Sequence, residues 1–215
     1  MHFTIENLIK INTSLLELKK NNTPKIIAVS KTFPLENIMP LIEYGHKDFG
    51  ENKVQECIDK WKDFKQVKKD IKLHLIGKLQ RNKVKFAVDI FDYIHSVDNE
   101  RLAKKISEEI IKNKKDIKIF IQVNIGNENQ KSGIAVKNLD NFYQYCKHLN
   151  LNVVGLMCIP PLEQNPEKYF HQMKSLNEKL NLNELSMGMS ADYLLAAKYS
   201  SSFLRIGSNI FGKRS

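Results

Sequence analysis

The sequence predicts an α/β fold: a (β/α)8 TIM barrel that forms a single domain over residues 1–215, with an extra helix before the first strand. Three observations lead to this prediction. Eight short apolar segments alternate with amphipathic segments of helical period, and strict βα alternation implies parallel strands. No linker, repeat or low-complexity tract divides the chain. No GxGxxG or P-loop fingerprint follows the first strand, as it usually does in an open doubly wound sheet, so we favour a closed barrel over that alternative.

The first third of the chain contains the leading helix and two βα units. Inward-facing isoleucines and leucines at helical spacing predict a helix over residues 4–21, and the β-branched run 26–29 predicts a buried strand. The next helix has an apolar face at i, i+3, i+4 and i+7 spacing, formed by Leu35, Ile38, Met39 and Ile42. Pro40 should kink or shorten that helix, and Gly45 should follow its end. A short strand is expected at 47–49, followed by a helix from about Lys53.

The middle third repeats the alternation with shorter elements. Strands are predicted at 72–76, 93–96 and 117–123, the last being the clearest in the chain. A short helix is predicted at 82–88. A longer one should begin after Asp98 or Asn99, either of which can cap its first turn.

The last third completes eight units. A helix is predicted around 139–146, a strand at 153–157, and a helix that opens at Asn165 and Pro166. A short strand is expected at 184–185, then a helix capped by Ser190. The final strand, 203–206, has no predicted helix after it.

Composition narrows the classes of protein. Hydrophobic residues make up 42% of the chain and charged residues 27%, a globular balance, and no apolar run approaches the ~20 residues of a membrane span. The N-terminus lacks a signal-peptide pattern, which predicts a cytoplasmic protein. Cys57, Cys146 and Cys158 form no CxxC pair, so idle thiols are favoured over a disulfide framework or a metal site.

The net charge of +10 has two readings. It could serve an anionic partner such as nucleic acid, a membrane surface or a phosphorylated ligand. Alternatively, it reflects solvated lysine-rich helix faces. The lysines are spread over the whole chain and the arginines number only four, with no arginine-rich stripe. We therefore favour the second reading and expect no nucleic-acid or membrane partner.

The carboxyl ends of the predicted strands carry the polar residues that are candidates for a functional site. Active sites of such barrels form at these ends. Lys31 follows the first strand, where a charged amine is rarely placed for packing, and partial burial favours the neutral, nucleophilic amine that carbonyl chemistry needs. Five of the nine glycines lie in or beside these segments: Gly50, Gly77, Gly155, Gly188 and Gly207. This polarity points to a ligand at one face.

Two segments after the last predicted strands could bind phosphate. Residues 186–190 precede a helix and residues 205–208 follow the final strand, which are the usual phosphate positions in barrels. Arg205 either pairs with Glu184 or Asp192, or donates to an anion or a ring nitrogen. A Schiff-base lysine opposite a phosphate pocket suggests pyridoxal phosphate, but the residues alone do not distinguish this from an aldolase that binds a sugar phosphate.

Longer motifs resolve that choice by resemblance. The segment KIIAVSKTFP (25–34) resembles the cofactor-lysine strand of the pyridoxal-phosphate homeostasis protein family, small barrels similar to the N-terminal domain of alanine racemase. The other matching motifs follow in order: FGENKVQE (49–56), HLIGKLQRNK (74–83), KSG (131–133), GLMCIPP (155–161), LSMGMSADY (185–193) and RIGSNIFGKR (205–214). The resemblance covers essentially the whole chain.

The resemblance implies a role for eight residues. Lys31 would hold pyridoxal 5′-phosphate as an internal aldimine, Asn52 would line the ring pocket, and Arg205 would lie near the pyridine nitrogen. Ser190, Gly207 and Ser208 would bind the phosphate. His74 and Met187 would have supporting roles, although His74 could equally be a satisfied core histidine. Phe33 and Lys53 depart from the family pattern, and neither is expected to touch the chemistry.

The resemblance also implies a role in intracellular cofactor homeostasis and delivery to apo-enzymes, without evident catalysis. A racemase needs acid and base groups on both faces of the bound substrate. In the racemases that the family resembles, one of these is a tyrosine from a separate C-terminal domain of the partner subunit. The chain ends at Ser215, leaving no sequence for that domain, and only Tyr193 lies near a predicted site loop. We therefore expect a monomeric carrier with no catalytic residue and no metal; the alternative is a weak pyridoxal-phosphate-dependent amino-acid racemase.

Overall fold

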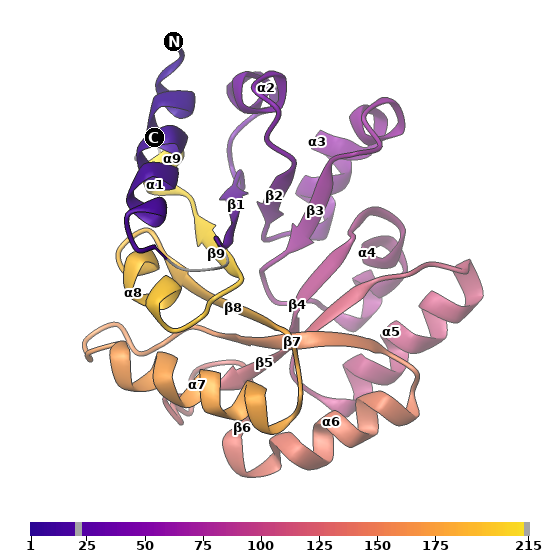
Figure 1. Ribbon diagram of the computed structural model, residues 1–215. Coiled ribbons are helices and arrows are strands. Elements are labelled where there is room, and N and C mark those ends of the chain that lie inside the picture. The colour runs from indigo at the N-terminus through magenta and orange to yellow at the C-terminus, as the bar shows by residue number, and fades with distance from the viewer. Residues whose placement is uncertain (20–22, 213–215) are drawn as a thin grey trace.

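Eight parallel strands close into a barrel in the computed structural model, which describes residues 1–19 and 23–212 (Figure 1). The ring strands are β1 (Lys25–Val29), β2 (Asp48–Glu51), β3 (Lys72–Leu75), β4 (Tyr93–Val97), β5 (Lys118–Asn124), β7 (Asn152–Cys158), β8 (Glu184–Met189) and β9 (Phe203–Ile206). Strands adjacent in sequence are adjacent in the ring, and the β1–β9 and β4–β5 pairings complete it. The predicted barrel is therefore confirmed. An unpredicted two-residue strand, β6 (Ile134–Ala135), adds to β5 outside the ring.

Helices cover the outside of the ring (Figure 1). They are α1 (Phe3–Leu16), α2 (Leu35–Glu43), α3 (Val54–Val67), α4 (Val84–Ile90), α5 (Glu100–Asn113), α6 (Leu139–His148), α7 (Glu167–Lys179), α8 (Tyr193–Lys198) and α9 (Ser208–Phe211). One-turn 3-10 segments, η1 (Arg81–Lys83) and η2 (Val136–Asn138), lead into α4 and α6. Asn99 caps α5 by accepting from the Leu102 amide at 2.9 Å, as one of the two predicted caps.

Two helices near the N-terminus test the predicted boundaries, and the first of them ends earlier than predicted. The leading helix ends at Leu16 and not near residue 21; residues 20 and 21 lie outside the described residues. The amide of Lys19 bonds to the Leu16 carbonyl, and Lys19 takes a left-handed φ of 49°, which breaks the helix. Pro40 lies inside α2, which is nine residues long and ends at Glu43, in agreement with the prediction of a short helix followed by Gly45.

Two corrections concern the C-terminal quarter. A helix that the sequence did not predict, α9, follows the last strand and lies beside α1, where Asn7 Nδ2 donates to the Ile210 carbonyl at 3.1 Å (Figure 1). Ser190 does not cap α8, because β8 extends to Met189 and the helix begins only at Tyr193. The Ser190 hydroxyl instead accepts from the Asn209 amide of α9 at 3.4 Å.

The core has two layers, because successive strand residues point to opposite faces of the sheet. The larger layer fills the space between strands and helices. The smaller one fills the barrel interior and consists of Ile27, Tyr93, Phe120, Met157 and Phe203. On the same strand as Ile27, its neighbours Ile26 and Ala28 belong to the outer layer.

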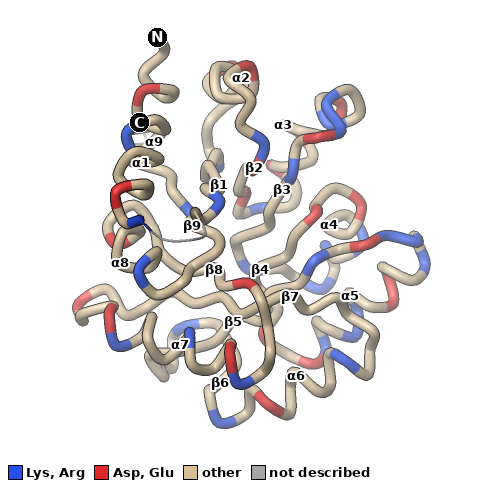
Figure 2. The backbone as a smooth tube through the Cα atoms, in the orientation of Figure 1, with Lys and Arg blue, Asp and Glu red and all other residues tan. Residues whose placement is uncertain are grey.

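The cysteines are free thiols, as the sequence predicts, and charged residues of both signs lie on the outer elements. All three cysteines are free and buried, and burial raises the pKa of Cys146 and Cys158 to about 12. Within residues 1–19 and 23–212, no cluster of His, Cys, Asp and Glu has the arrangement of a metal site. None of the helices in these ranges combines the length and apolar composition that a membrane crossing requires. Lysines and arginines alternate with acidic residues along the outer elements (Figure 2).

Candidate functional site

A cavity of about 720 Å³ opens at the carboxyl ends of the strands. Its walls come from the segments that follow β1, β2, β3, β7, β8 and β9, which is the end of the barrel where the sequence predicted a ligand site. Six of the eight predicted site residues line it: Lys31, Asn52, Ser190, Arg205, Gly207 and Ser208. Residues 174 positions apart in sequence, from Lys31 to Arg205, thus meet in one cavity.

Lys31 lies two residues beyond β1, on the loop that leads to α2. The strand end is fixed by Ser30, whose amide donates to the Gly50 carbonyl at 3.0 Å. The following residue, Thr32, has a left-handed φ of 69°, so the chain turns sharply just after the lysine. This geometry places Lys31 at the cavity wall while the chain itself leaves the barrel.

The predicted phosphate residues gather where β8 and β9 end. The Ser190 carbonyl accepts from Asn209 Nδ2 at 2.8 Å, which ties the loop after β8 to the first residues of α9. At Gly207 the backbone lies near Val29, and an added Cβ would come within 3.4 Å of the Val29 Cβ. Ser190, Gly207 and Ser208 therefore form one wall of the cavity with hydroxyl and backbone amide donors, which suit an anion.

Arg205 forms the floor of the cavity beside this wall. Its side chain is buried, and its Nη1 donates to the carbonyl and hydroxyl of Ser186, both at 2.7 Å. Its Nη2 donates to the Cys158 carbonyl at 2.8 Å. A guanidinium has five N–H groups, so these three bonds leave donors for a ligand. Among the described residues, neither Glu184 nor Asp192 forms an ion pair with Arg205, so the hypothesis that Arg205 serves only in a salt bridge with one of them is wrong.

A chain of hydrogen bonds runs from Arg205 through the barrel interior. The Ser186 hydroxyl lies 2.9 Å from His95 Nδ1, and His95 Nε2 lies 3.0 Å from His74 Nδ1. His74 Nε2 then lies 2.9 Å from Asp48 Oδ1, at the opposite end of the barrel. The two histidine rings stack on Tyr93 and Phe120. We call this buried chain, Arg205–Ser186–His95–His74–Asp48, the interior relay.

The chemistry of its two ends sets the direction of the interior relay. Arg205 can only donate, and the Asp48 carboxylate can only accept. The Ser186 hydroxyl therefore donates to His95, His95 to His74, and His74 to Asp48, with both imidazoles neutral. Burial, together with the neighbouring positive charge of Arg205, holds the pKa of His95 well below its usual value, and burial also lowers that of His74.

The carboxylate end is stabilised as an anion. Burial by itself would raise the pKa of Asp48, but the hydrogen bond from His74 and the nearby positive charge of Lys25 outweigh it. The pKa of Asp48 therefore lies below its usual value. Burial likewise lowers the pKa of Arg205, which titrates so far above neutrality that the guanidinium stays charged.

His74 and Met187 do not lie on the wall of the cavity. His74 is fully buried within the interior relay, below Arg205, which fits the reading of a satisfied core histidine. Met187 belongs to the outer core layer, since it alternates with the inward-facing Ser186 on β8. Spacing along the strand could have assigned Met187 to that layer.

Several wall residues were missed by the sequence reasoning. They are mostly apolar: Val29, Phe33, Ile76, Ile159, Met189, Ala191 and Gly212. Phe33 contradicts the expectation that it lies away from the chemistry: it lines the cavity and stacks on Phe211 of α9, with ring centroids 4.9 Å apart. The signal available in the sequence was position, because all of these residues except Gly212, which follows α9, end a strand or lie in the loop after one.

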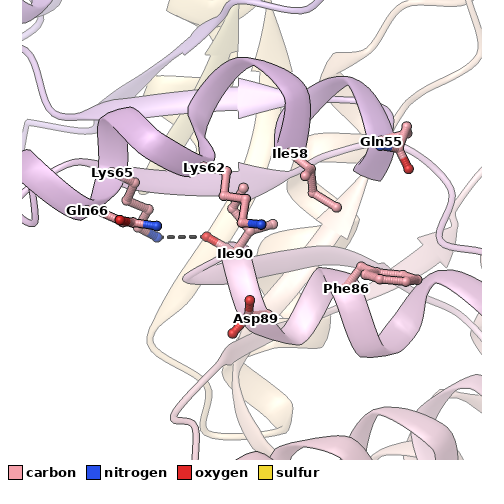
Figure 3. Close-up of a pocket in the computed structure, with 8 residues that line it drawn as sticks. All are labelled: Gln55, Ile58, Lys62, Lys65, Gln66, Phe86, Asp89 and Ile90. Carbon is pink, nitrogen blue, oxygen red and sulfur yellow. Dashed lines mark hydrogen bonds between the residues drawn. The ribbon is translucent and has the colours of Figure 1, made fainter.

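A second hollow lies on the outer surface, between α3 and α4 (Figure 3). It measures about 450 Å³ and is lined by Gln55, Ile58, Lys62, Lys65, Gln66, Phe86, Asp89 and Ile90. Lys65 spans the two helices by donating to the Ile90 carbonyl at 2.7 Å (Figure 3). It also donates to Asp92 at 2.5 Å. Its walls are outer helix faces and not strand ends, so it is not the site that the sequence predicted.

Comparison with known proteins gives consistent matches over the whole chain. The family model described as "Alanine racemase, N-terminal domain" matches residues 7–215. A pyridoxal phosphate homeostasis protein of Aquifex aeolicus is 38% identical over 203 residues, which span 90% of this chain and 88% of the relative. The protein of that name from Escherichia coli K12 is 34% identical over 199 residues, spanning 88% of this chain and 85% of the relative.

Solved structures support the same relationship. PipY of Synechococcus elongatus, solved without pyridoxal phosphate, superposes with a TM-score of 0.88 at 32% identity, covering 98% of this chain and all of the other. The same protein with pyridoxal phosphate bound gives a TM-score of 0.82 at 33% identity, covering 94% of this chain and all of the other. An alanine racemase from Clostridium difficile shares the fold alone, with a TM-score of 0.75 at 12% identity over 99% of this chain and 57% of the racemase.

Proposed function

We propose, from the premise that this chain belongs to the pyridoxal phosphate homeostasis proteins of the alanine racemase N-terminal domain family, that it binds pyridoxal 5′-phosphate through Lys31 and serves cofactor homeostasis. One observation carries the proposal: Lys31, Arg205 and the Ser190–Gly207–Ser208 wall line the same cavity. The Lys31 amine matches the aldehyde of that cofactor, and the Arg205 guanidinium matches its ring nitrogen. The hydrogen-bond donors of the Ser190–Gly207–Ser208 wall match its phosphate.

The residues present fit this cofactor chemically. When bound, pyridoxal phosphate supplies an aldehyde carbon and a pyridine ring that accepts electrons. Lys31 would hold the cofactor through its amine, which can condense with the aldehyde and release the carbonyl oxygen as water. Ser190, Gly207 and Ser208, which line the cavity, would hold the phosphate, and Asn52 on the same wall would line the ring. Arg205 would donate to the ring nitrogen and so keep it unprotonated.

The wall of the cavity favours a carrier over an enzyme. Within the described residues that line it, Lys31 is the one side chain of the kinds that usually move protons, namely His, Asp, Glu, Tyr, Cys or Lys. A racemase needs such a group on each face of its substrate. We therefore propose a non-catalytic role, in which the protein buffers the cofactor in the cytoplasm as a monomer and delivers it to apo-enzymes. Weak amino-acid racemisation is the second candidate.

The decisive experiment maps the lysine that reacts. Purified protein is mixed with pyridoxal phosphate, its absorbance is recorded, and the adduct is fixed with borohydride and located by peptide mass. Wild type should carry the adduct on Lys31, and Lys31→Ala should lose both the absorbance band and the modification. Lys62→Ala, which changes a lysine of the outer hollow, serves as the matched control. An adduct on another residue in wild type would refute the proposal.

A second measurement separates carrier from enzyme. Small amino acids are incubated with the loaded protein in deuterated water, and exchange of the α-proton is followed by NMR. The carrier proposal expects exchange no faster than with free pyridoxal phosphate. Faster exchange that disappears in Lys31→Ala would support the racemase alternative.

A further inference from the structure

A mostly buried cluster beside Lys31 comes from Ser30, from the motif FGENKVQE and from helix α3, which begins within that motif. Its members are Ser30, Glu51, Glu56, Lys60 and Trp61, and none of them lines the cavity. Ser30, Glu51 and Trp61 are fully buried, and the Lys60 side chain is only 9% exposed. Charged groups at such depth in a barrel wall need a structural or functional reason.

The centre of the cluster is one carboxylate oxygen. Glu51 Oε1 accepts from the Ser30 hydroxyl at 2.7 Å, from Lys60 Nζ at 2.9 Å and from Trp61 Nε1 at 2.9 Å. The other oxygen, Oε2, has no partner within the described residues. Lys60 therefore supplies the positive charge that balances this buried carboxylate.

The cluster holds the backbone on both sides of Lys31. On one side, Lys60 Nζ donates to the Ser30 carbonyl at 2.8 Å. On the other side, the Thr32 amide donates to Glu56 Oε1, and Lys60 lies 3.5 Å from that same oxygen. Thr32 is a β-branched residue with a left-handed φ of 69°, a conformation that persists only when surrounding contacts impose it.

We propose that Glu51, Glu56 and Lys60 are positioning residues that direct Lys31 toward the aldehyde of the bound cofactor. The inference rests on the proposed function, since it assigns the orientation of the same lysine. Lys60 fixes the carbonyl before Lys31, Glu56 fixes the amide after it, and Glu51 fixes Lys60. Loss of the Lys60 contact to the Ser30 carbonyl, or of the Glu56 contact to the Thr32 amide, lets the loop rotate. The Lys31 amine then meets the aldehyde less often, while the phosphate and ring sites are unchanged.

Glu56→Ala tests the proposal with little risk to the fold, because the Glu56 side chain is 27% exposed. It removes the acceptor for the Thr32 amide. Loss of one hydrogen bond of ordinary strength should slow condensation of Lys31 with pyridoxal phosphate by about five- to tenfold in stopped-flow absorbance. Glu56→Gln keeps an acceptor oxygen and should restore most of the rate.

A ligand without the aldehyde separates positioning from damage to the cavity. Affinity for 4′-deoxypyridoxine 5′-phosphate, which keeps ring and phosphate, should be the same in wild type, Glu56→Ala and Glu56→Gln. Equal condensation rates in wild type and Glu56→Ala would overturn the proposal. A matching loss of affinity for the deoxy analogue would overturn it as well.

A lysine pair on α3 gives a second test. Lys60 and Lys65 each donate to a carboxylate and to a backbone carbonyl. The partners of Lys65 are Asp92, which precedes β4, and Ile90, which ends α4, whereas Lys31 follows the carboxyl end of β1. Both Lys60→Met and Lys65→Met should lower stability, whereas only Lys60→Met should slow condensation. Equal slowing in both would overturn the proposal. If wild type itself gives no borohydride-fixed adduct on Lys31, the proposed function fails, which is a distinct outcome.

Discussion

Ser186→Ala cuts the interior relay at its junction with Arg205. The hydroxyl accepts from Arg205 Nη1 at 2.7 Å and donates to His95 Nδ1 at 2.9 Å, and both neighbours are buried. Arg205 keeps its bond to the Ser186 carbonyl, so its position changes little. His95 Nδ1 is left without a donor in a buried site, which costs about 1–3 kcal/mol. With part of a charge-assisted bond also lost, we expect a total of about 3 kcal/mol.

Urea unfolding at neutral pH measures this loss directly. For a chain of this length, about 3 kcal/mol also corresponds to a fall of roughly 6–12 °C in Tm. Ser107→Ala is the matched control, because Ser107 is a buried serine whose hydroxyl makes a single bond to the Leu149 carbonyl at 2.8 Å. It should cost about 1 kcal/mol.

Nitrogen-15 NMR of the histidine rings tests whether the hydrogen-bond direction of the interior relay explains the expected loss of stability. In wild type both His74 and His95 should be neutral and protonated at Nε2, as the direction of the interior relay requires. A Ser186→Ala cost no larger than that of Ser107→Ala would refute the reasoning. Protonation of His95 at Nδ1 in wild type would refute it independently.

Two further predictions concern stability. An alanine Cβ at Gly155 would lie 1.8 Å from the Glu184 carbonyl oxygen, so Gly155→Ala should force β7 and β8 apart and lower the free energy of unfolding by about 3 kcal/mol or more. At Gly207 the nearest contact of an added Cβ is 3.4 Å, so Gly207→Ala should change the free energy of unfolding by less than about 1 kcal/mol. Similar values for the two variants would contradict the packing argument. Burial lowers the pKa of His46, His74 and His95 in the folded protein. Below pH about 6.5 these histidines therefore bind protons in the unfolded chain but not in the folded one, and the free energy of unfolding should fall by up to about 1.4 kcal/mol per histidine per pH unit. The lowered pKa of Asp48 adds its own loss only below about pH 4, and a urea midpoint unchanged between pH 7.5 and 5.5 would contradict the assignment of buried neutral histidines.

Much of the candidate site could be predicted from the sequence because barrels collect their strand ends at one face. Lys31 and Arg205 each follow or end an apolar run, so strand prediction alone brought them to the same cavity. The same logic missed Phe33, because a phenylalanine after a strand carries no polar signal. It also missed α9, a four-residue helix too short for any periodic pattern.

Contacts between distant segments were decided only in the tertiary structure. Asp48, His74, His95 and Ser186 lie on four different strands, and their order along the chain does not reveal that they form one hydrogen-bonded line beneath Arg205. Likewise, nothing in the motif FGENKVQE indicates that its two glutamates act together with Lys60 on the backbone around Lys31. Hydrogen bonds of this kind depend on side-chain direction at a given depth in the barrel, which period and composition do not encode.

The sequence by itself determined the barrel and the end of it that carries the cavity, because alternating apolar patterns fix which elements form and parallel strands share one carboxyl edge. The tertiary structure decided which of the predicted residues reach the cavity. It turned Met187 outward, placed His74 below the floor, and added Phe33 to the wall. The physical reason is that pleat alternation and strand depth, set by the closed ring, govern where each side chain points.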